Sequence, residues 1–281
     1  MFQRDTTEPG VKRSVDGIGR IVAVASGKGG VGKSTVTVNL ALTLTLAGKK
    51  VAILDGDIYG PNIPMLLGVR RRAGVDELDA MMSVGGSLPR SQRHRPLDRY
   101  GLTIFRLAFL VGEAQHLLPG NAALSGMLIR QILFDTDWGE QDYLLIDLPP
   151  GTGEPQASLA AQIMIDGVVL VVTPQNTALL DTARSFRMFT ESKTRVLGVV
   201  ENMSYFVCPH CGERLDMDGD SGADWTLTDG VGDRLGQLPF DPFVSRSSNT
   251  GRPIVIAEPD SVAAKAFMEI ARAVDAALTS H

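Results

Sequence analysis

The sequence contains very little cysteine: two residues in 281, Cys208 and Cys211. Two cysteines cannot form the disulfide framework that holds small secreted domains together. The chain also lacks any apolar run of the ~18–20 residues that a membrane-spanning helix needs. The N-terminal stretch MFQRDTTEPGVKRSVDG has no apolar core after its charges, so we expect it not to be a secretory signal. We therefore expect a cytoplasmic protein whose thiols stay reduced.

Aromatic residues and net charge are low as well. Aromatics make up 6% of the chain, and the formal net charge is −5. This balance offers no general attraction to nucleic acid or to an anionic membrane surface, so we expect neither as a partner. The hydrophobic share of 44% is ordinary for a folded domain.

Apolar runs of strand length alternate with longer helical segments after a polar tail at 1–19. The predicted strands are 20–26, 50–55, 102–110, 142–149, 167–174 and 195–202. The predicted helices are 33–48, 121–135, 154–165, 177–190 and 259–280, the last capped by Asp260 or Ser261. Such alternation predicts an α/β fold: a doubly wound, mostly parallel sheet with helices on both faces, in one domain over 20–281. The polar stretches 68–100 and 212–236 are predicted to be surface loops.

A glycine-rich loop, GKGGVGKST at 27–35, follows the first strand and opens the first helix. It fits the P-loop pattern in the context that this pattern requires. Its N–H groups and the helix N-terminus would surround phosphate oxygens, Lys33 would reach the β- and γ-phosphates, and Ser34 would bind Mg²⁺. The alternative is a glycine turn with an incidental lysine.

A second lysine, Lys28, occupies a position that the ordinary pattern leaves free. One use for it is to stabilise charge that develops on a transferring γ-phosphate, as an arginine finger does. The alternative is a solvated surface lysine.

Carboxylates end two further strands. Asp55 and Asp57 lie in ILDGDIYGPN, and Asp147 lies in LLIDLPPGTG. Strand-end carboxylates at one edge of a parallel sheet lie where phosphate and Mg²⁺ bind. Asp147 fits the Walker-B acid, and Asp57 or Asp55 would lie near an attacking water. The guanine-specific motif [NT]-K-x-D is absent, which favours adenine.

These motifs together resemble the Mrp/ApbC family of iron–sulfur cluster carrier ATPases, within the ParA, MinD and nitrogenase iron protein superclass of SIMIBI-type P-loop NTPases. The resemblance runs from about residue 20 to the C-terminus. The stretches that carry it are SGKGGVGKST, DGDIYGPNIPMLLG, DWGEQDYLLIDLPPGTGE, VVTPQNTALLDTARSFRMF and VLGVVENMSYFVCPHCGE. It departs from the family's pattern at Gly56, at LLPGNAA (117–123), at 215–230 and in the arginine-rich 70–99.

The resemblance implies roles for particular residues. Lys28 would reach nucleotide across a homodimer, Lys33 and Asp57 would act in hydrolysis, and Cys208 and Cys211 would bind the cluster. The implied nucleotide-binding set is Gly27, Lys28, Gly29, Gly30, Val31, Gly32, Lys33, Ser34, Thr35, Asp55, Asp147, Asn202, Pro239 and Asp241. The implied cofactors are ATP, Mg²⁺ and a [4Fe-4S] cluster, and the implied partners are a second copy and apo iron–sulfur proteins that receive the cluster.

Ligand count leads to the same dimer. A cubane takes four thiolates, and structural zinc takes four ligands, whereas one chain has two thiols. A two-fold axis at this loop would supply four. Zinc within one chain, zinc shared by a dimer and a thioredoxin-like redox pair are the alternatives for the cysteines. The rival functions are a ParA/MinD-type positioning ATPase, in which the cysteines have no role, and a zinc-linked dimeric ATPase switch.

Overall fold

The structure is a computed structural model, and it describes residues 12–57, 63–69, 94–106, 122–217 and 233–280. Most of the predicted arginine-rich loop and much of the divergent stretch at 215–230 lie outside these ranges, as do residues 1–11 of the predicted tail. Within the described residues, no helix is both long and apolar enough to cross a membrane.

One sheet of nine strands forms the centre of the described structure, and β9 joins it beside β7. Its order is β3-β4-β2-β5-β1-β6-β7-β8, and all pairings are parallel except those of the two edge strands, β3 with β4 and β8 with β7. The strands are β1 (Ile18–Ala25), β2 (Val51–Asp55), β3 (Leu97–Arg99), β4 (Leu102–Arg106), β5 (Gln141–Asp147), β6 (Gly167–Val172), β7 (Val196–Val207), β8 (Arg214–Asp216) and β9 (Arg234–Pro239).

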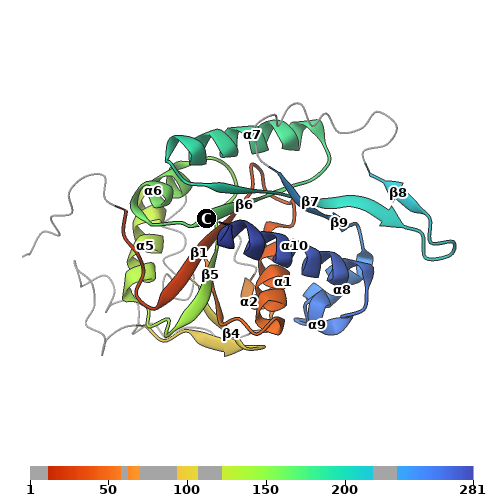
Figure 1. Ribbon diagram of the computed structural model, residues 1–281, viewed down its shortest axis with the longest axis horizontal. Coiled ribbons are helices and arrows are strands. Elements are labelled where there is room, and N and C mark those ends of the chain that lie inside the picture. The colour runs from red at the N-terminus through yellow and green to blue at the C-terminus, as the bar shows by residue number, and fades with distance from the viewer. Residues whose placement is uncertain (1–11, 58–62, 70–93, 107–121, 218–232, 281) are drawn as a thin grey trace, which may run out of the picture.

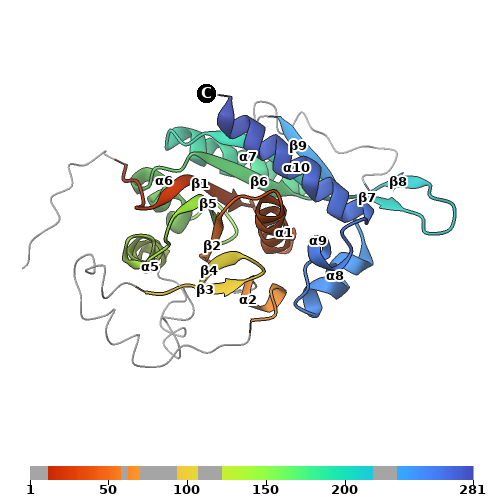
Figure 2. The ribbon, with the colours of Figure 1, turned by 60° about the horizontal axis from the view of Figure 1, so that its bottom comes forward.

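Helices cover both faces of this sheet (Figures 1 and 2). One buried apolar cluster joins the sheet to α5, α6 and α7, and a second joins its other face to α1, α2, α9 and α10. The helices are α1 (Lys33–Leu46), α2 (Ile63–Leu66), α5 (Ala122–Asp135), α6 (Glu154–Gln162), α7 (Asn176–Glu191), α8 (Pro242–Asn249), α9 (Ile254–Ala257) and α10 (Val262–Thr279). The predicted doubly wound α/β fold is confirmed.

The central strands are apolar on both faces, which explains why they form a covered parallel sheet. All residues of β2 and β6 are buried. Strands buried on both sides read as continuous apolar runs instead of alternating ones. The N-terminus of α10 agrees with one of the two predicted caps, because the Ser261 hydroxyl accepts a hydrogen bond from the Ala264 N–H at 3.1 Å.

The structure corrects the prediction at the ends of the sheet. Strands β3, β8 and β9 lie wholly or partly in stretches predicted as loops, and β7 continues to Val207 instead of ending near residue 202. β3 and β8 are edge strands of 3 residues each, too short to give a clear local pattern, and β9 forms through pairing with the more distant β7. Residues 12–17, which the sequence assigned to the tail, contact the folded body: the Lys12 ammonium donates to the Ser192 carbonyl at 2.8 Å, and Arg13 pairs with Ile163.

The β7–β8 hairpin extends from one end of the sheet (Figure 1). Phe206 of β7 pairs with Leu215 of β8, and Val207 pairs with Arg214. The turn between the two strands contains both cysteines. The longest strand of the sheet therefore runs from the protein's centre to the thiol pair.

Candidate functional site

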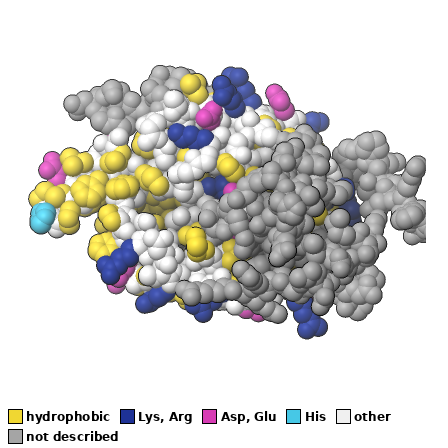
Figure 3. Space-filling model, turned by 180° about the vertical axis from the view of Figure 1, so that it is seen from behind, with side chains coloured by type: hydrophobic (Ala, Val, Ile, Leu, Met, Phe, Trp, Pro, Cys, Tyr) yellow, Lys and Arg dark blue, Asp and Glu magenta, His cyan; other side chains and the backbone are white. Residues whose placement is uncertain are grey.

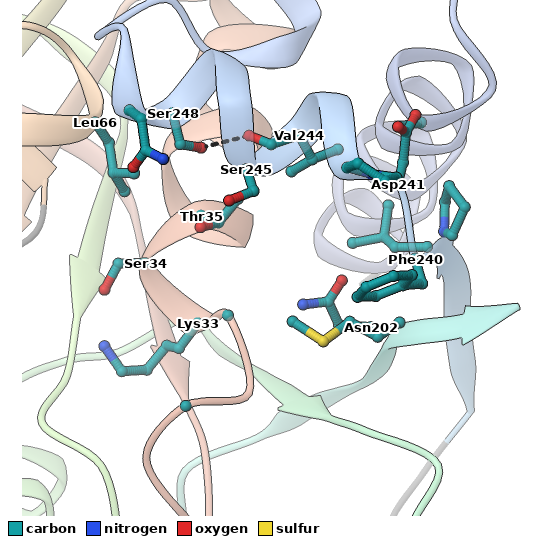
Figure 4. Close-up of a pocket in the computed structure, with 18 of the residues that line it drawn as sticks. Lys33, Ser34, Thr35, Leu66, Asn202, Phe240, Asp241, Val244, Ser245 and Ser248 are labelled. Atoms are coloured by element: carbon teal, nitrogen blue, oxygen red, sulfur yellow. Dashed lines mark hydrogen bonds between the residues drawn. The ribbon is translucent and has the colours of Figure 1, made fainter. Parts of the chain in front are cut away.

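A cavity of about 930 Å³ lies over the glycine-rich loop and within the size range of nucleotide and cofactor sites. Most of the predicted nucleotide residues line it. Figure 4 shows Lys33, Ser34 and Thr35 on one side of the space, with Asn202, Phe240 and Asp241 opposite. The predicted residues at the cavity are Lys28, Gly29, Gly30, Gly32, Lys33, Ser34, Thr35, Asp57, Asn202, Pro239 and Asp241.

The loop between β1 and α1 has the conformation that a phosphate cradle requires. Gly32 precedes the first helical residue and has φ 83°, a left-handed value that glycine adopts without strain. The Asn202 amide donates to the Val31 carbonyl at 2.8 Å, and a Cβ on Gly32 would overlap that amide. Gly32 is therefore required both for its backbone conformation and for the close approach of β7.

Asp147 is the centre of a buried polar cluster at the start of α1. It is fully buried and forms an ion pair with the Lys33 ammonium at 2.8 Å. The hydroxyls of Ser34 and Thr37 donate to the same carboxylate at 2.6 and 2.8 Å. A hydroxyl and a carboxylate side by side at the end of a strand are the groups that hold Mg²⁺ in P-loop proteins, so these residues fit that ion.

The carboxyl end of β2 approaches the same point. The Gly56 N–H donates to the Asp147 carbonyl at 3.0 Å, which ties the end of β2 to that of β5. Asp55 is fully buried and accepts a hydrogen bond from the Asp57 N–H at 3.3 Å. Of these two predicted carboxylates, Asp57 lines the cavity together with Lys28.

Four predicted residues lie behind the cavity instead of on its wall: Gly27, Val31, Asp55 and Asp147. Gly27 packs against α7, where a Cβ would overlap Asp181. The Val31 side chain is buried in the core while its carbonyl binds Asn202. These contacts make Gly27 and Val31 supports for the loop.

Gln156 of α6 holds the segment that follows β5. Its side chain is 1% exposed, and its amide donates to the carbonyls of Pro149, Pro150 and Gly151 at 2.7, 3.3 and 3.2 Å. The Gly151 N–H in turn donates to the Ser26 carbonyl at 2.8 Å, just before the P-loop. Because Pro150 lines the cavity, Gln156 shapes one wall of the site from behind.

Replacing Gln156 with leucine, which keeps the volume but removes the donor, should weaken ADP binding about tenfold and lower the free energy of unfolding by about 1–3 kcal/mol. The freed segment would then sample positions that do not fit the ligand. The matched control is Gln162→Leu on the same helix, where the side chain bonds Arg130 at the surface. ADP titration and thermal unfolding measure both effects, and equal ADP affinity in the two variants would contradict this role.

Several residues at or behind the cavity are not among the predicted ones. Met203, Phe240 and Arg246 line it, and Thr37 and Gln156 support it. Thr37 could have been found, because it follows Ser34 by three residues and so faces the same side of the helix. The others have no local signal, since they reach the cavity only through the pairing of β7 with β9 and the packing of α6 and α8.

The cysteine pair lies in the tight turn that joins β7 to β8. The Cys208 N–H donates to the Glu213 carbonyl at 2.8 Å, and the Gly212 N–H donates to the Cys208 carbonyl at 2.9 Å. Backbone N–H groups of Cys211 and His210, together with the Cys211 side chain, stabilise the thiolate and lower the pKa of Cys208 below its usual value. A thiolate is the form that binds metal.

The thiols are accessible and lie far from the nucleotide cavity along the strand. Cys211 is exposed and Cys208 is partly exposed. Among the residues that the structure describes, no group of three or more His, Cys, Asp or Glu side chains is arranged to hold a metal ion. Hydrophobic side chains gather at this end of the molecule (Figure 3), and Leu215 on β8 and Met217 just after it are 52% and 49% exposed.

Comparison with known proteins identifies the family. A family model described as "ParA: NUBPL iron-transfer P-loop NTPase" matches residues 17–275. The chain belongs to this family. An iron–sulfur cluster carrier protein of Aquifex aeolicus is 41% identical over 263 residues, which cover 93% of this chain and 68% of that protein. The predicted resemblance to iron–sulfur cluster carriers is confirmed.

Solved structures of this NTPase class share the fold. A nucleotide-binding protein from Archaeoglobus fulgidus, solved in complex with ADP, superposes with a TM-score of 0.67 at 37% identity, covering 88% of this chain and 90% of that one. The septum site-determining protein MinD of Pyrococcus horikoshii, complexed with Mg-ADP, gives 0.66 at 25% identity over 91% and 96% of the two chains.

Proposed function

We propose that this protein is an ATP-hydrolysing iron–sulfur cluster carrier that acts as a homodimer, binds a bridging [4Fe-4S] cluster as its cargo and transfers it to apoproteins. One observation carries the proposal: β7 lines the P-loop cavity, and an accessible thiol pair lies just beyond the end of the same strand. The names of its relatives as cluster carriers support the cargo. A reducing cytoplasm suits free thiols.

The nucleotide-binding part of the proposed function follows from the cavity. Backbone N–H groups of Gly29–Gly32 and the Lys33 ammonium bind the phosphates, and Ser34 with Asp147 holds Mg²⁺. When bound, Mg²⁺ neutralises charge on the phosphate oxygens. In the structure the Lys33 ammonium is paired with Asp147, so a phosphate that enters the cavity competes with that carboxylate for the ammonium. Asp57, at the wall of the cavity, orients the attacking water.

The base half of the cavity suits a flat purine ring. Leu238, Phe240 and Val244 supply apolar surface, while Asn202 and Asp241 supply polar edges. Asp241 is held in place as the cap of α8, where it accepts from the Phe243 N–H at 2.8 Å. With the guanine motif absent from the sequence, adenine is the base that we assign.

The cluster-binding part of the proposed function follows from the number of thiolate ligands that a cluster needs. Cys208 and Cys211 supply two thiolates, a cubane needs four, and a second copy of the hairpin across a two-fold axis supplies the rest. The exposed apolar side chains of Leu215 and Met217, on β8 and just after it, lie on a surface of the hairpin that a partner can cover. ATP turnover would reshape this interface and so change how tightly the cluster is held.

The deciding experiment is an anaerobic absorbance spectrum of reconstituted protein with iron and sulfide counts. A broad charge-transfer band with equal iron and sulfide supports the carrier. Zinc at half a mole per chain with no iron uptake would instead show the zinc-linked switch. Retention of full cellular function without either cysteine would favour a MinD-type positioning ATPase, which needs no thiol.

Lys28 is expected to act across the dimer, and mixing two inactive chains tests this. A Lys28→Ala chain and an Asp57→Ala chain, mixed so that subunits exchange, should recover about a quarter of wild-type ATPase activity, because half of the dimers are mixed and each has one complete site. The control mixes Lys28→Ala with the double variant Lys28→Ala/Asp57→Ala and should stay inactive. If proven heterodimers show no recovery, Lys28 does not act in trans.

A further inference from the structure

Strand β7 connects the two candidate sites directly. Asn202 binds the P-loop carbonyl of Val31, and Cys208 follows the end of the same strand six residues later. At strand geometry this separation is about 20 Å. No other described strand joins the nucleotide cavity to the thiol pair.

An irregularity interrupts β7 between these two points. Its pairing with β9 steps from Glu201↔Gln237 to Tyr205↔Pro239, so β7 advances four residues while β9 advances two. Two extra residues of β7 therefore form a bulge in the interval 202–204. Met203, within it, has φ 56°, the left-handed conformation that residues with a side chain rarely adopt.

One side of the bulge contacts the nucleotide cavity, and the other contacts the base of the hairpin that carries the thiols. On the nucleotide side, Met203 lines the cavity, and its terminal methyl lies 3.8 Å from the position a Cβ on Gly32 would take. On the hairpin side, the Ser204 carbonyl accepts from the Met217 N–H at 2.8 Å at the open end of the β7–β8 pair. A change in the backbone of Met203 would therefore turn the hairpin relative to the P-loop.

We propose that Met203 is a positioning residue, through which a nucleotide in the cavity sets the bulge at 202–204 and thereby the direction of the hairpin that carries Cys208 and Cys211. A bulge re-aims the residues that follow it, and a residue held in a sparsely populated conformation has a relaxed alternative close by. Nucleotide packed against the Met203 side chain selects one of the two arrangements. That the thiols carry a cluster rests on the proposed function; the link from nucleotide to hairpin does not.

The test measures how fast iodoacetamide alkylates Cys208 in cluster-free protein, in a Cys211→Ala background in which Cys208 is the only thiol of the chain. Saturating Mg-ADP should slow the reaction about fivefold in this background. Adding Met203→Gly, which relieves the left-handed conformation and removes the side chain, should bring the ratio of rates with and without Mg-ADP close to one. Met203→Leu, which keeps an apolar side chain of similar size, should restore the ratio.

The matched control is Lys193→Gly. Lys193 has φ 53°, almost the value of Met203, but lies in the turn before β7, at the far end from the thiols. This variant should leave the nucleotide effect unchanged. A Met203→Gly protein that binds Mg-ADP and keeps the full effect would overturn the proposal, as would a lack of any effect with Met203 present.

Hydrogen exchange of the unaltered chain tests the same route if the glycine variant does not fold. Mg-ADP should change the exchange of amides at 203–207 together with those at 208–213. Protection that changes at 208–213 while 203–207 stay constant would show that the signal bypasses β7. Because neither assay needs a cluster, failure of iron binding would refute the carrier function and leave this link standing.

Discussion

Alanine at Cys208 or at Cys211 should each abolish iron binding. The intact protein, reconstituted anaerobically, should approach two irons per chain, since ~four irons are shared by two chains. Either substitution leaves a symmetric dimer with two thiolates, which do not hold a cubane. Nucleotide binding should persist, because neither cysteine lines the cavity. Iron and sulfide assays with ADP titration measure both results.

His210→Ala is the control for this experiment. His210 lies in the same exposed turn, between the two cysteines, and carries a side chain that could bind a metal. If four thiolates form the site, this variant should keep the full iron content. Loss of metal in His210→Ala, or iron retained at wild-type level in either cysteine variant, would refute the four-thiolate site.

Lys33→Ala should reduce ATP hydrolysis at least about a thousandfold, because this ammonium is the P-loop cation that stabilises charge on the β- and γ-phosphates. The structure adds an expected cost in stability. Lys33 is 6% exposed and pairs with a fully buried carboxylate, so its removal leaves Asp147 with only the Ser34 and Thr37 hydroxyls. Breaking such a pair should lower the free energy of unfolding by about 3–5 kcal/mol.

A double variant separates the two effects. Lys33→Met/Asp147→Asn removes both charges of the pair, so stability should return towards the wild-type value while hydrolysis stays absent. Thermal unfolding and a phosphate-release assay give the two readings. Undiminished turnover in Lys33→Ala would overturn the P-loop assignment, and a double variant as unstable as the single one would contradict the buried-pair account.

Local sequence determined the parts of this protein that short-range geometry controls. The central strands were predictable because β2 and β6 are continuous apolar runs that only a sheet covered on both faces can bury. The P-loop was predictable because its glycines, Lys33 and Ser34 are neighbours in the chain. The proposal of a second copy rests on a count of thiols, which no folding of one chain can change.

The tertiary structure alone decided what distant segments do to each other. Asp147 reaches Lys33 across more than a hundred residues, and Gln156, Met203 and Phe240 reach the cavity through packing and strand pairing. Strand β9 and the extension of β7 to the cysteines have weak local patterns, because β9 is stabilised by pairing with the earlier part of β7 and the extension by pairing with β8. The left-handed Met203 could not be read from sequence at all. Met203 adopts this conformation because β7 has two more residues than β9 between their paired positions. The whole sheet sets the register of that pairing.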